Sequence, residues 1–386
     1  MDFQLSEEQK MLKETVRQFV EREIRPHAME WDEKAVFVPD ELIEKYAEMG
    51  LLGMTLPERY GGQGLGVFEA ILVIEEIAKV SCLAAFPVFE SNVGPVRVIE
   101  LFGTEEQKKK YLPRCCRGEI LISVGMTEPE AGSAVTDLRT RAVLKGDHYI
   151  VNGTKRFVTG GGHSEVYVVY VRLSDLPGAK GIGALIIEKG TPGFVFGKQE
   201  RFMGLSGFPS CDLIFEDCKV PKENLVVPEG GFKRLMQAFD IERLGNATMS
   251  LGIATGALEE SIKYSKERKQ FGKEICEFQA VQLMLADMAM KVEAARLLIY
   301  RAAVNASRGY PSILHSSIAK CFSNEIAKEV TDLALQIHGG YGYSKEYPIE
   351  RMLRDSRGWP VAGGTVQMQR INIASELIGR RFNQRK

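Results

Sequence analysis

The feature that most constrains the fold of this chain is a change of hydrophobic period, from helical to strand-like and back. Near the N-terminus, Leu12, Val16 and Phe19 fall on one helical face, behind a capping box formed by Ser6 and Gln9. The run VYVVYV at 166–171 and its glycine-rich surroundings are typical of strands. Residues 274–308 contain no glycine or proline, and a second helical run covers 313–337. This order argues against the alternating βαβ pattern of a Rossmann fold.

The change of period divides the chain into three predicted domains of an α+β protein. We expect an N-terminal α-helical domain over residues 1–118, a β-domain over 119–228 and a C-terminal helical bundle over 229–386. Within the β-domain, Asn152-Gly153 carries the signature of a tight hairpin turn. Bundles of long helices often associate with copies of themselves. The sequence therefore predicts a multidomain protein that forms oligomers.

Composition excludes several classes of function. The chain has 50 basic and 51 acidic residues in 386, so it lacks the excess positive charge that nucleic-acid binding requires. No run of about 18 apolar residues is present to span a membrane. The seven cysteines form no C-x-x-C pair, and the five histidines show no metal-ligand spacing, so we expect reduced thiols and no metal. Since the N-terminus also lacks signal-peptide features, we expect a bacterial cytoplasmic protein, or a mitochondrial matrix protein if the chain is a processed eukaryotic one.

Several motifs in a fixed order point to one family. They are Met126–Ser133 (MTEPEAGS), Gly153–Thr159, Phe215–Pro221, Arg268–Lys273, Gln336–Gly340 and Arg354–Asp355. With these motifs the chain resembles the acyl-CoA dehydrogenase family over essentially its whole length. The resemblance implies a helical domain, a β-domain and a C-terminal four-helix bundle, with FAD between the domains and usually four subunits. Two departures stand in the first motif, where Glu130 replaces a usual Gly and Ala134 a usual Asp.

The resemblance also implies which residues hold FAD. The turn from Met126 to Ser133 touches the flavin ring in the family, and a glycine-rich turn exposes backbone N–H groups and hydroxyls to a ligand. A guanidinium such as that of Arg268 suits the pyrophosphate because it binds phosphate in a bidentate manner, here across a subunit interface. The complete predicted set is Met126, Thr127, Gly132, Ser133, Phe157, Thr159, Arg268, Phe271, Gln279, Gln336, Gly339, Gly340, Thr365 and Gln367.

The catalytic base requires separate treatment. The family reaction removes a proton from Cα of an acyl-CoA and passes a hydride from Cβ to flavin N5, so it needs a carboxylate kept dry beside Cα. Many members carry this Glu in a Tyr-Glu-Gly-Thr motif, whose counterpart here is Val361–Thr365 with Gly363 at the Glu position. Members similar to isovaleryl-CoA and long-chain acyl-CoA dehydrogenases place it on an earlier helix before an Arg. Phe239–Leu244 fits that motif, and we predict Glu242 as the base.

The acyl pocket is predicted from the same resemblance. Ala362 and Gly363 replace Tyr and Glu beside the thioester, which makes room for a branched, cyclic or aryl acyl group, such as a benzylsuccinyl-like one. Glu90 matches the helix at the far end of the pocket, and Asp240 and Arg243 match the CoA channel. The predicted substrate-binding residues are Ser133, Glu90, Phe239, Asp240, Arg243, Gly363 and Gly364.

Alternative functions remain open at this point. The first hypothesis is α,β-dehydrogenation to the trans-2-enoyl-CoA, with electrons leaving to an electron-transferring flavoprotein from a homotetramer. A related flavoenzyme would instead reduce an enoyl-CoA, or act as a distal-carbon (1,4-type) dehydrogenase with Glu90 as base. A third hypothesis is a catalytically inactive scaffold that binds flavin and CoA, because the C-terminal Glu is missing.

Overall fold

The N-terminal part of the chain is a layer of helices. The computed structural model describes residues 4–306 and 309–382, so the chain ends and the end of the predicted 274–308 run lie outside the described residues. The predicted capping box is present: the Ser6 hydroxyl accepts from the Gln9 backbone, and the Gln9 side chain accepts from Ser6 N. The helices are α1 (Glu7–Glu23), α2 (Ala28–Lys34), α3 (Asp40–Glu48), α4 (Val67–Ala78), α5 (Cys82–Asn92), α6 (Val96–Phe102) and α7 (Glu105–Cys116).

A mainly antiparallel sheet follows. Its strand order is β6-β7-β3-β2-β4-β5-β8, and β1 joins it by pairing in parallel with β4. The VYVVYV run forms β4, whose side chains on both faces are buried, as expected for a continuous apolar strand. The strands are β1 (Ile122–Gly125), β2 (Arg141–Lys145), β3 (His148–Thr159), β4 (Val166–Arg172), β5 (Ile182–Glu188), β6 (Phe194–Phe196), β7 (Ser210–Pro221) and β8 (Leu225–Val227).

The predicted hairpin turn at Asn152-Gly153 is wrong, because both residues lie inside β3. The register of β3 against β7 shifts between Val151 and Gly153, so the glycine marks a bulge rather than a turn. A Cβ on Gly153 would lie 2.6 Å from the Thr140 Cα, so close approach of two backbones explains this glycine. The actual turn between β2 and β3 contains Gly146, which has a φ of 63°.

The C-terminal part is built around one long helix. Helix α8 (Phe232–Glu267) runs for 36 residues and packs against α4, α9 (Gln279–Val304) and α10 (Ile313–His338). It approaches α4 closely because a Cβ on Gly252 would lie 2.5 Å from the Ala78 Cβ. The small hairpin of β9 (Lys269–Gln270) and β10 (Lys273–Glu274) connects α8 to α9, and α11 (Gly340–Tyr343), α12 (Ile349–Ser356) and α13 (Val366–Ile378) complete the chain.

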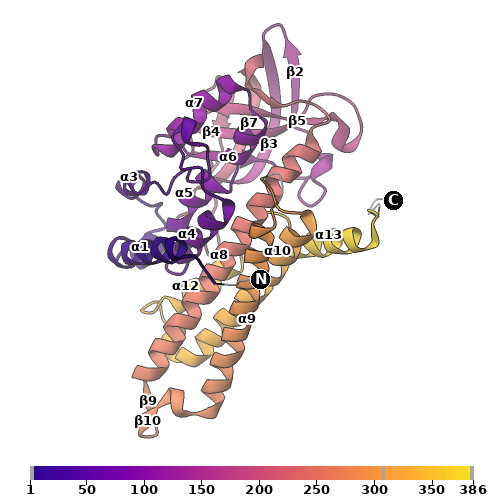
Figure 1. Ribbon diagram of the computed structural model, residues 1–386. Helices are drawn as coiled ribbons and strands as arrows, with labels where there is room; N and C mark the ends of the chain where they lie inside the picture. The colour runs from indigo at the N-terminus through magenta and orange to yellow at the C-terminus, as the bar shows by residue number, and fades with distance from the viewer. Residues whose placement is uncertain (1–3, 307–308, 383–386) are drawn as a thin grey trace.

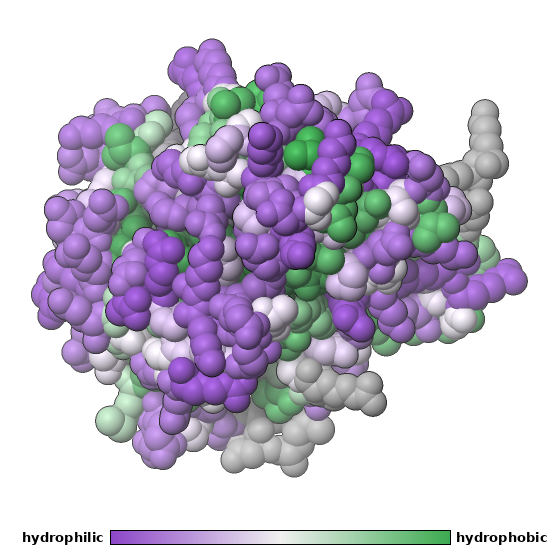
Figure 2. All heavy atoms as spheres, turned by 90° about the horizontal axis from the view of Figure 1, so that it is seen from above, coloured by the Kyte–Doolittle hydropathy of each residue, from purple (hydrophilic) through white to green (hydrophobic). Residues whose placement is uncertain are grey.

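Helix α8 belongs to the third predicted domain and also contacts α4 of the first and β8 of the second. Figure 1 shows the β-sheet at one end of the molecule, the N-terminal helices beside it, and α8 descending from the sheet to the β9–β10 hairpin at the other end. The proposed domain limits fall between α7 and β1 and between β8 and α8. Seen from above, the surface is mainly hydrophilic with scattered hydrophobic groups (Figure 2). No helix in residues 4–306 and 309–382 is long and apolar enough to cross a membrane.

Candidate active site

Glu242, the predicted base, lies in the first third of α8. Its side chain is half-buried, and its carboxylate makes no hydrogen bond or ion pair to any residue that the structure describes. Burial raises the pKa of Glu242 to about 8, while the charges of Arg243 and Lys320 oppose this shift. A carboxyl group with a pKa near neutrality is suited to take up or release a proton at carbon.

Asp240 and Arg243, one helical turn apart, form a buried ion pair beside Glu242. The Asp240 carboxylate also accepts a hydrogen bond from the Ser316 hydroxyl at 3.1 Å, and the Arg243 guanidinium lies 5.2 Å from the centre of the Phe239 ring. Burial raises the pKa of Asp240, with Arg243 as the main opposing charge. The positive charge of Arg243 is therefore largely neutralised within the pair.

A loop before α13 approaches the same part of α8. Gly363 and Gly364 have φ values of 63° and 81°, which favour glycine, and a Cβ on Gly363 would lie 3.2 Å from Asn246 Nδ2. Asn246 is one turn beyond Glu242, and its amide donates to the Ala362 carbonyl at 3.4 Å. The structure thus brings the predicted residues 239, 240, 242, 243, 363 and 364 together.

Glu90 faces the same region from α5. It is only 5% exposed, and its Oε2 has no hydrogen-bond partner among the described residues. Burial raises its pKa well above the usual value, and the charge of Glu242 raises it further. Two carboxyl groups from different elements therefore share one desolvated region, where each disfavours the ionised form of the other.

The predicted flavin-contacting residues surround the end of β3. Residues 126–133 form a turn between β1 and β2, with Gly132 and Ser133 exposed. Phe157 is 52% exposed and has a φ of 55°, an uncommon conformation for an aromatic residue. Thr159, the last residue of β3, is half-buried.

A buried ion pair holds the turn at residues 126–133 against β3. Lys155 is fully buried in β3, and its ammonium contacts the Glu128 carboxylate at 2.8 Å and the Met126 carbonyl at 3.2 Å. Glu128 in turn accepts hydrogen bonds from the backbone N–H groups of Arg139 and Thr140. Burial lowers the pKa of Lys155 to about 8, and Glu128 opposes this change. Sequence analysis placed Glu128 and Lys155 in motifs without assigning them this role.

The other predicted FAD residues lie elsewhere. Arg268 and Phe271 belong to the β9–β10 hairpin, at the end of the bundle away from the sheet (Figure 1). The Arg268 guanidinium lies 5.4 Å from the Tyr341 ring, and Phe271 is 94% exposed. The exposed residues Gln279, Gln336, Gly339 and Gly340 occupy the start of α9 and the end of α10. Thr365 caps α13 by accepting from the Met368 N–H, and Gln367 is exposed.

Sequence analysis missed Lys320 and Asn324. Lys320 is completely buried in α10, and its ammonium donates to the carbonyls of Ala362 and Gly364, both at 2.9 Å. Ser316, Lys320 and Asn324 recur every four residues, so they form a polar stripe on one face of a helix. That regular spacing on one helix face was the available signal.

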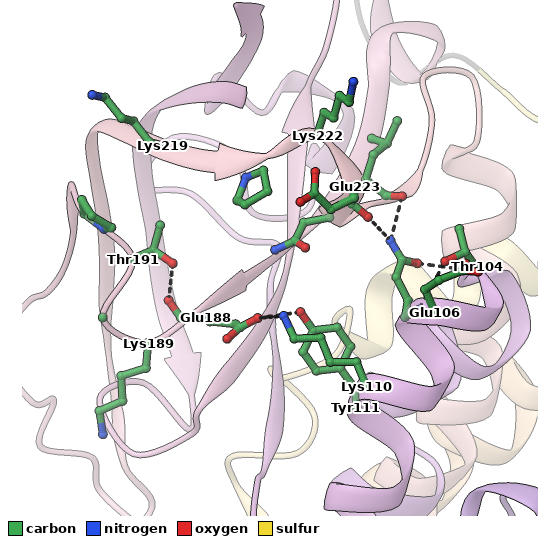
Figure 3. Close-up of a pocket in the computed structure, with 16 residues that line it drawn as sticks. Thr104, Glu106, Lys110, Tyr111, Glu188, Lys189, Thr191, Lys219, Lys222 and Glu223 are labelled. Carbon is green, nitrogen blue, oxygen red and sulfur yellow. Dashed lines mark hydrogen bonds and ion pairs between the residues drawn. The ribbon is translucent and has the colours of Figure 1, made fainter. Parts of the chain in front are cut away.

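One surface groove lies away from the predicted site residues. A groove of about 760 Å³ lies between the start of α7 and the ends of β5 and β7, and no predicted site residue lines it. Figure 3 shows its paired side chains: Lys110 and Tyr111 both contact the Glu188 carboxylate, at 2.5 and 2.7 Å.

Comparison with protein families covers nearly the whole chain. Models of the acyl-CoA dehydrogenase N-terminal, middle and C-terminal domains match residues 6–119, 123–218 and 229–378. The chain belongs to the acyl-CoA dehydrogenase family. This confirms the predicted family and its fold of helical, β and helical domains, and it identifies the protein as an oxidoreductase acting on CH–CH groups.

Relatives in the acyl-CoA dehydrogenase family include both dehydrogenases and reductases. The acryloyl-CoA reductase (NADH) of Anaerotignum propionicum is 44% identical over 98% of this chain and 97% of its own. The butyryl-CoA dehydrogenase structure from Megasphaera elsdenii is 39% identical, with a TM-score of 0.94 over 98% of this chain and all of that chain. A structure concerning the electron transferring flavoprotein of Acidaminococcus fermentans contains a chain that is 45% identical, with a TM-score of 0.95 and the same coverage.

The acyl-CoA dehydrogenase family depends on FAD, and the residues present fit this cofactor. An exposed aromatic ring at Phe157 offers a face to a flat ring system. Open space where a Cβ would stand at Gly132, Gly339 and Gly340 lets a ligand approach the backbone closely. The two groups of predicted FAD residues lie at opposite ends of α8.

Proposed function

We propose that this protein catalyses the FAD-dependent α,β-dehydrogenation of an acyl-CoA to the trans-2-enoyl-CoA, with Glu242 as the base. The observation that carries the proposal is the Glu242 carboxyl itself, which is desolvated, has no protein partner and has a pKa of about 8. Such a group accepts the α-proton at neutral or slightly alkaline pH. FAD, when bound, supplies a hydride acceptor at N5.

Other residues of the chain have the remaining roles in the proposed reaction. Asp240 neutralises Arg243, so that the cation next to Glu242 does not form an ion pair with it. The loop at 359–364 lies beside Asn246, one turn beyond Glu242, and carries Ala362 and Gly363 where many family members carry Tyr and Glu. These two smaller residues support a branched, cyclic or aryl acyl group, such as a benzylsuccinyl-like one, as the substrate.

Enoyl-CoA reduction is the second candidate, and two observations favour it. The acryloyl-CoA reductase relative catalyses chemistry of that direction by its name. In addition, a carboxyl with a pKa of about 8 is mostly protonated at pH 7, so Glu242 would equally deliver a proton to Cα. The two proposals use the same residue in opposite directions.

The unpartnered carboxyl of Glu90 favours a third proposal, proton removal at a more distal carbon. For electron exchange we propose an electron-transferring flavoprotein, because one similar chain was solved in a study of such a protein. We also propose a homotetramer, which is typical of the family.

The test is anaerobic mixing of the FAD-loaded protein with butyryl-, isovaleryl-, cyclohexanecarboxyl- and benzylsuccinyl-CoA, followed by absorbance and product analysis. Dehydrogenation predicts flavin bleaching and a 2-enoyl product with at least one thioester. If none of the saturated thioesters bleaches the flavin, but the reduced protein is rapidly reoxidised by enoyl-CoAs, reduction is the function. A mono-unsaturated product whose new double bond lies away from the Cα–Cβ bond supports Glu90, and failure in both directions supports the inactive scaffold.

A further inference from the structure

Lys155 and Glu128 form a buried ion pair that contacts the predicted flavin turn on both sides of Thr127. The Lys155 ammonium in β3 lies 2.8 Å from the Glu128 carboxylate and donates to the Met126 carbonyl at 3.2 Å. The backbone N–H of Arg156, the next residue of β3, donates to the Thr127 carbonyl at 2.8 Å. Three successive residues of the turn are therefore attached to two successive residues of one strand.

Glu128 also fixes the rest of the turn and the segment that leads into β2. Its carboxylate accepts hydrogen bonds from the backbone N–H groups of Arg139 and Thr140, at 2.5 and 2.8 Å. Its backbone closes the turn, because Glu128 and Ala131 donate to each other's carbonyls at 3.2 and 3.1 Å. The ion pair with Lys155 is thus the link between β3 and a residue that organises the whole turn.

The stability of the fold does not by itself account for a charged pair in this place. Lys155 is 0% exposed and Glu128 is 6% exposed. Removing two charges from water costs about as much free energy as their attraction returns, and apolar residues of similar size often stabilise a fold equally well. A charged pair with several directed hydrogen bonds instead fixes the orientation of the groups that it binds.

The groups that the pair orients lie at an accessible surface. Gly132 and Ser133, which follow the closed part of the turn, are exposed, and no described atom lies within 4 Å of a Cβ built on Gly132. Phe157, two residues after Lys155 on β3, is 52% exposed. The base of the turn is therefore buried and fixed, while the residues predicted to contact the flavin remain open to a ligand.

We propose that Lys155 and Glu128 are positioning residues, which hold the turn at 126–133 in the conformation that accepts the flavin ring. The inference rests on the predicted place of FAD at this turn. A site that adopts its binding conformation only part of the time has an apparent Kd raised by the inverse of that fraction. If the turn without the ion pair adopts this conformation about a tenth of the time, the Kd for FAD rises about tenfold.

The experiment measures two properties of the FAD-loaded full chain in Lys155→Met, Glu128→Gln and the variant that carries both changes. The Kd comes from the flavin fluorescence released on serial dilution. The visible spectrum at saturating FAD reports the surroundings of the ring, because protein groups beside a flavin tune its electronics. The control is Glu75→Gln, which breaks a buried ion pair with Arg296 at 3.1 Å, between α4 and α9. Tm shows that each variant folds.

The proposal predicts a Kd raised about tenfold and an altered flavin spectrum in both single variants, and neither change in Glu75→Gln even where its Tm falls. In the double variant Tm recovers in part, because no buried charge is left unpaired, but the raised Kd and the altered spectrum persist. A folded double variant with the wild-type Kd and spectrum would overturn the proposal, and it decides the matter if the single variants do not fold.

Gly132→Phe separates this proposal from the predicted place of FAD. Because the space around the Gly132 Cβ position is open, a large ring there blocks a ligand without disturbing the packing of described residues. If this variant binds FAD as the wild type does, the predicted place of FAD is wrong and the proposal fails with it. If it loses FAD while the double variant of Lys155 and Glu128 keeps the wild-type Kd and spectrum, only the positioning role is wrong.

Discussion

At the scale of single residues, Glu242 carries a cost in stability that is linked to its chemistry. Its pKa is raised on folding from the ordinary value of 4.5 to about 8, so the folded state binds more protons than the unfolded state between these values. Stability contributed by the protonated carboxyl is complete below about pH 4.5 and is lost as pH rises towards 8. The desolvation that makes Glu242 a base therefore weakens the fold at alkaline pH.

This linkage gives a first prediction. Replacing Glu242 by Gln removes the titrating group, so the variant becomes more stable than the wild type as pH rises from 5 to 8. The gain reaches a few kcal/mol at most, since one pKa unit corresponds to about 1.4 kcal/mol. Thermal unfolding of the two proteins at pH 5 and pH 8.5 measures it, and an equal difference in Tm at both pH values would contradict a raised pKa for Glu242.

Glu90 gives a second prediction at this scale. If Glu242 is the base, Glu90→Gln keeps the rate of flavin bleaching within about tenfold, because the amide has the shape of the carboxyl and, since burial raises the Glu90 pKa, little negative charge is lost. If Glu90 is the base for a distal carbon, the same change costs about 10²–10⁴-fold. Single-turnover bleaching with the saturated acyl-CoA that reduces the wild-type flavin fastest distinguishes the two results.

At the scale of elements, α8 holds the candidate base in place because its glycines allow close packing. A Cβ on Gly256 would lie 2.1 Å from the Lys79 carbonyl, so the C-terminal end of α4 touches the α8 backbone there. We predict that Gly256→Ala lowers the free energy of unfolding by about 1–3 kcal/mol through overpacking. Gly340→Ala is the matched control, because open space surrounds its Cβ position; chemical denaturation of the apoproteins should leave that variant unchanged.

The helices and strands also show which parts of the fold the sequence patterns predict correctly. The β4 strand and the α10 helix were predicted to within a residue or two because each is one uninterrupted apolar pattern. The Asn152-Gly153 prediction failed because an Asn-Gly pair indicates a turn only when no neighbouring backbone needs the glycine. The Thr140 backbone approaches Gly153 from a neighbouring segment of the chain, and the residues around Asn152-Gly153 do not indicate this contact.

The candidate site likewise contains residues that the sequence predicts and residues that it does not. Glu242 was recognised because a Glu-Arg pair matched a known motif at the position where Gly363 left a base missing. The contacts of Lys320 are with three backbone carbonyls some 40 residues away, and its spacing with Ser316 and Asn324 marks a polar helix face without identifying these partners. Local bonds to the backbone, such as the cap at Ser6, follow a short sequence motif, whereas long-range ones do not.

At the scale of the whole molecule, the two groups of predicted FAD residues lie at opposite ends of α8, and we propose that they belong to the sites of two different FAD molecules in an oligomer. Phe271 is nearly completely exposed at the tip of the β9–β10 hairpin, where a ligand or a second chain could cover it. We predict a homotetramer of about 172 kDa, four chains of 43.0 kDa, in sedimentation experiments.

The hairpin provides the corresponding prediction by mutation. Phe271→Ser should lower the amount of FAD retained per chain after gel filtration, whereas Met11→Ser, which removes another exposed apolar side chain on α1, should not. Equal FAD retention in both variants would mean that Phe271 contacts neither FAD nor a neighbouring subunit that binds it.

The central claim is that the proton leaves or reaches Cα through Glu242. Its most direct test is the single-turnover rate of flavin bleaching in Glu242→Gln, measured with saturating acyl-CoA. The matched control is Glu259→Gln, an exposed glutamate on the same helix. We predict a loss of about 10²–10⁴-fold for Glu242→Gln with FAD still bound and no loss for the control. Bleaching of Glu242→Gln at the wild-type rate would contradict the account.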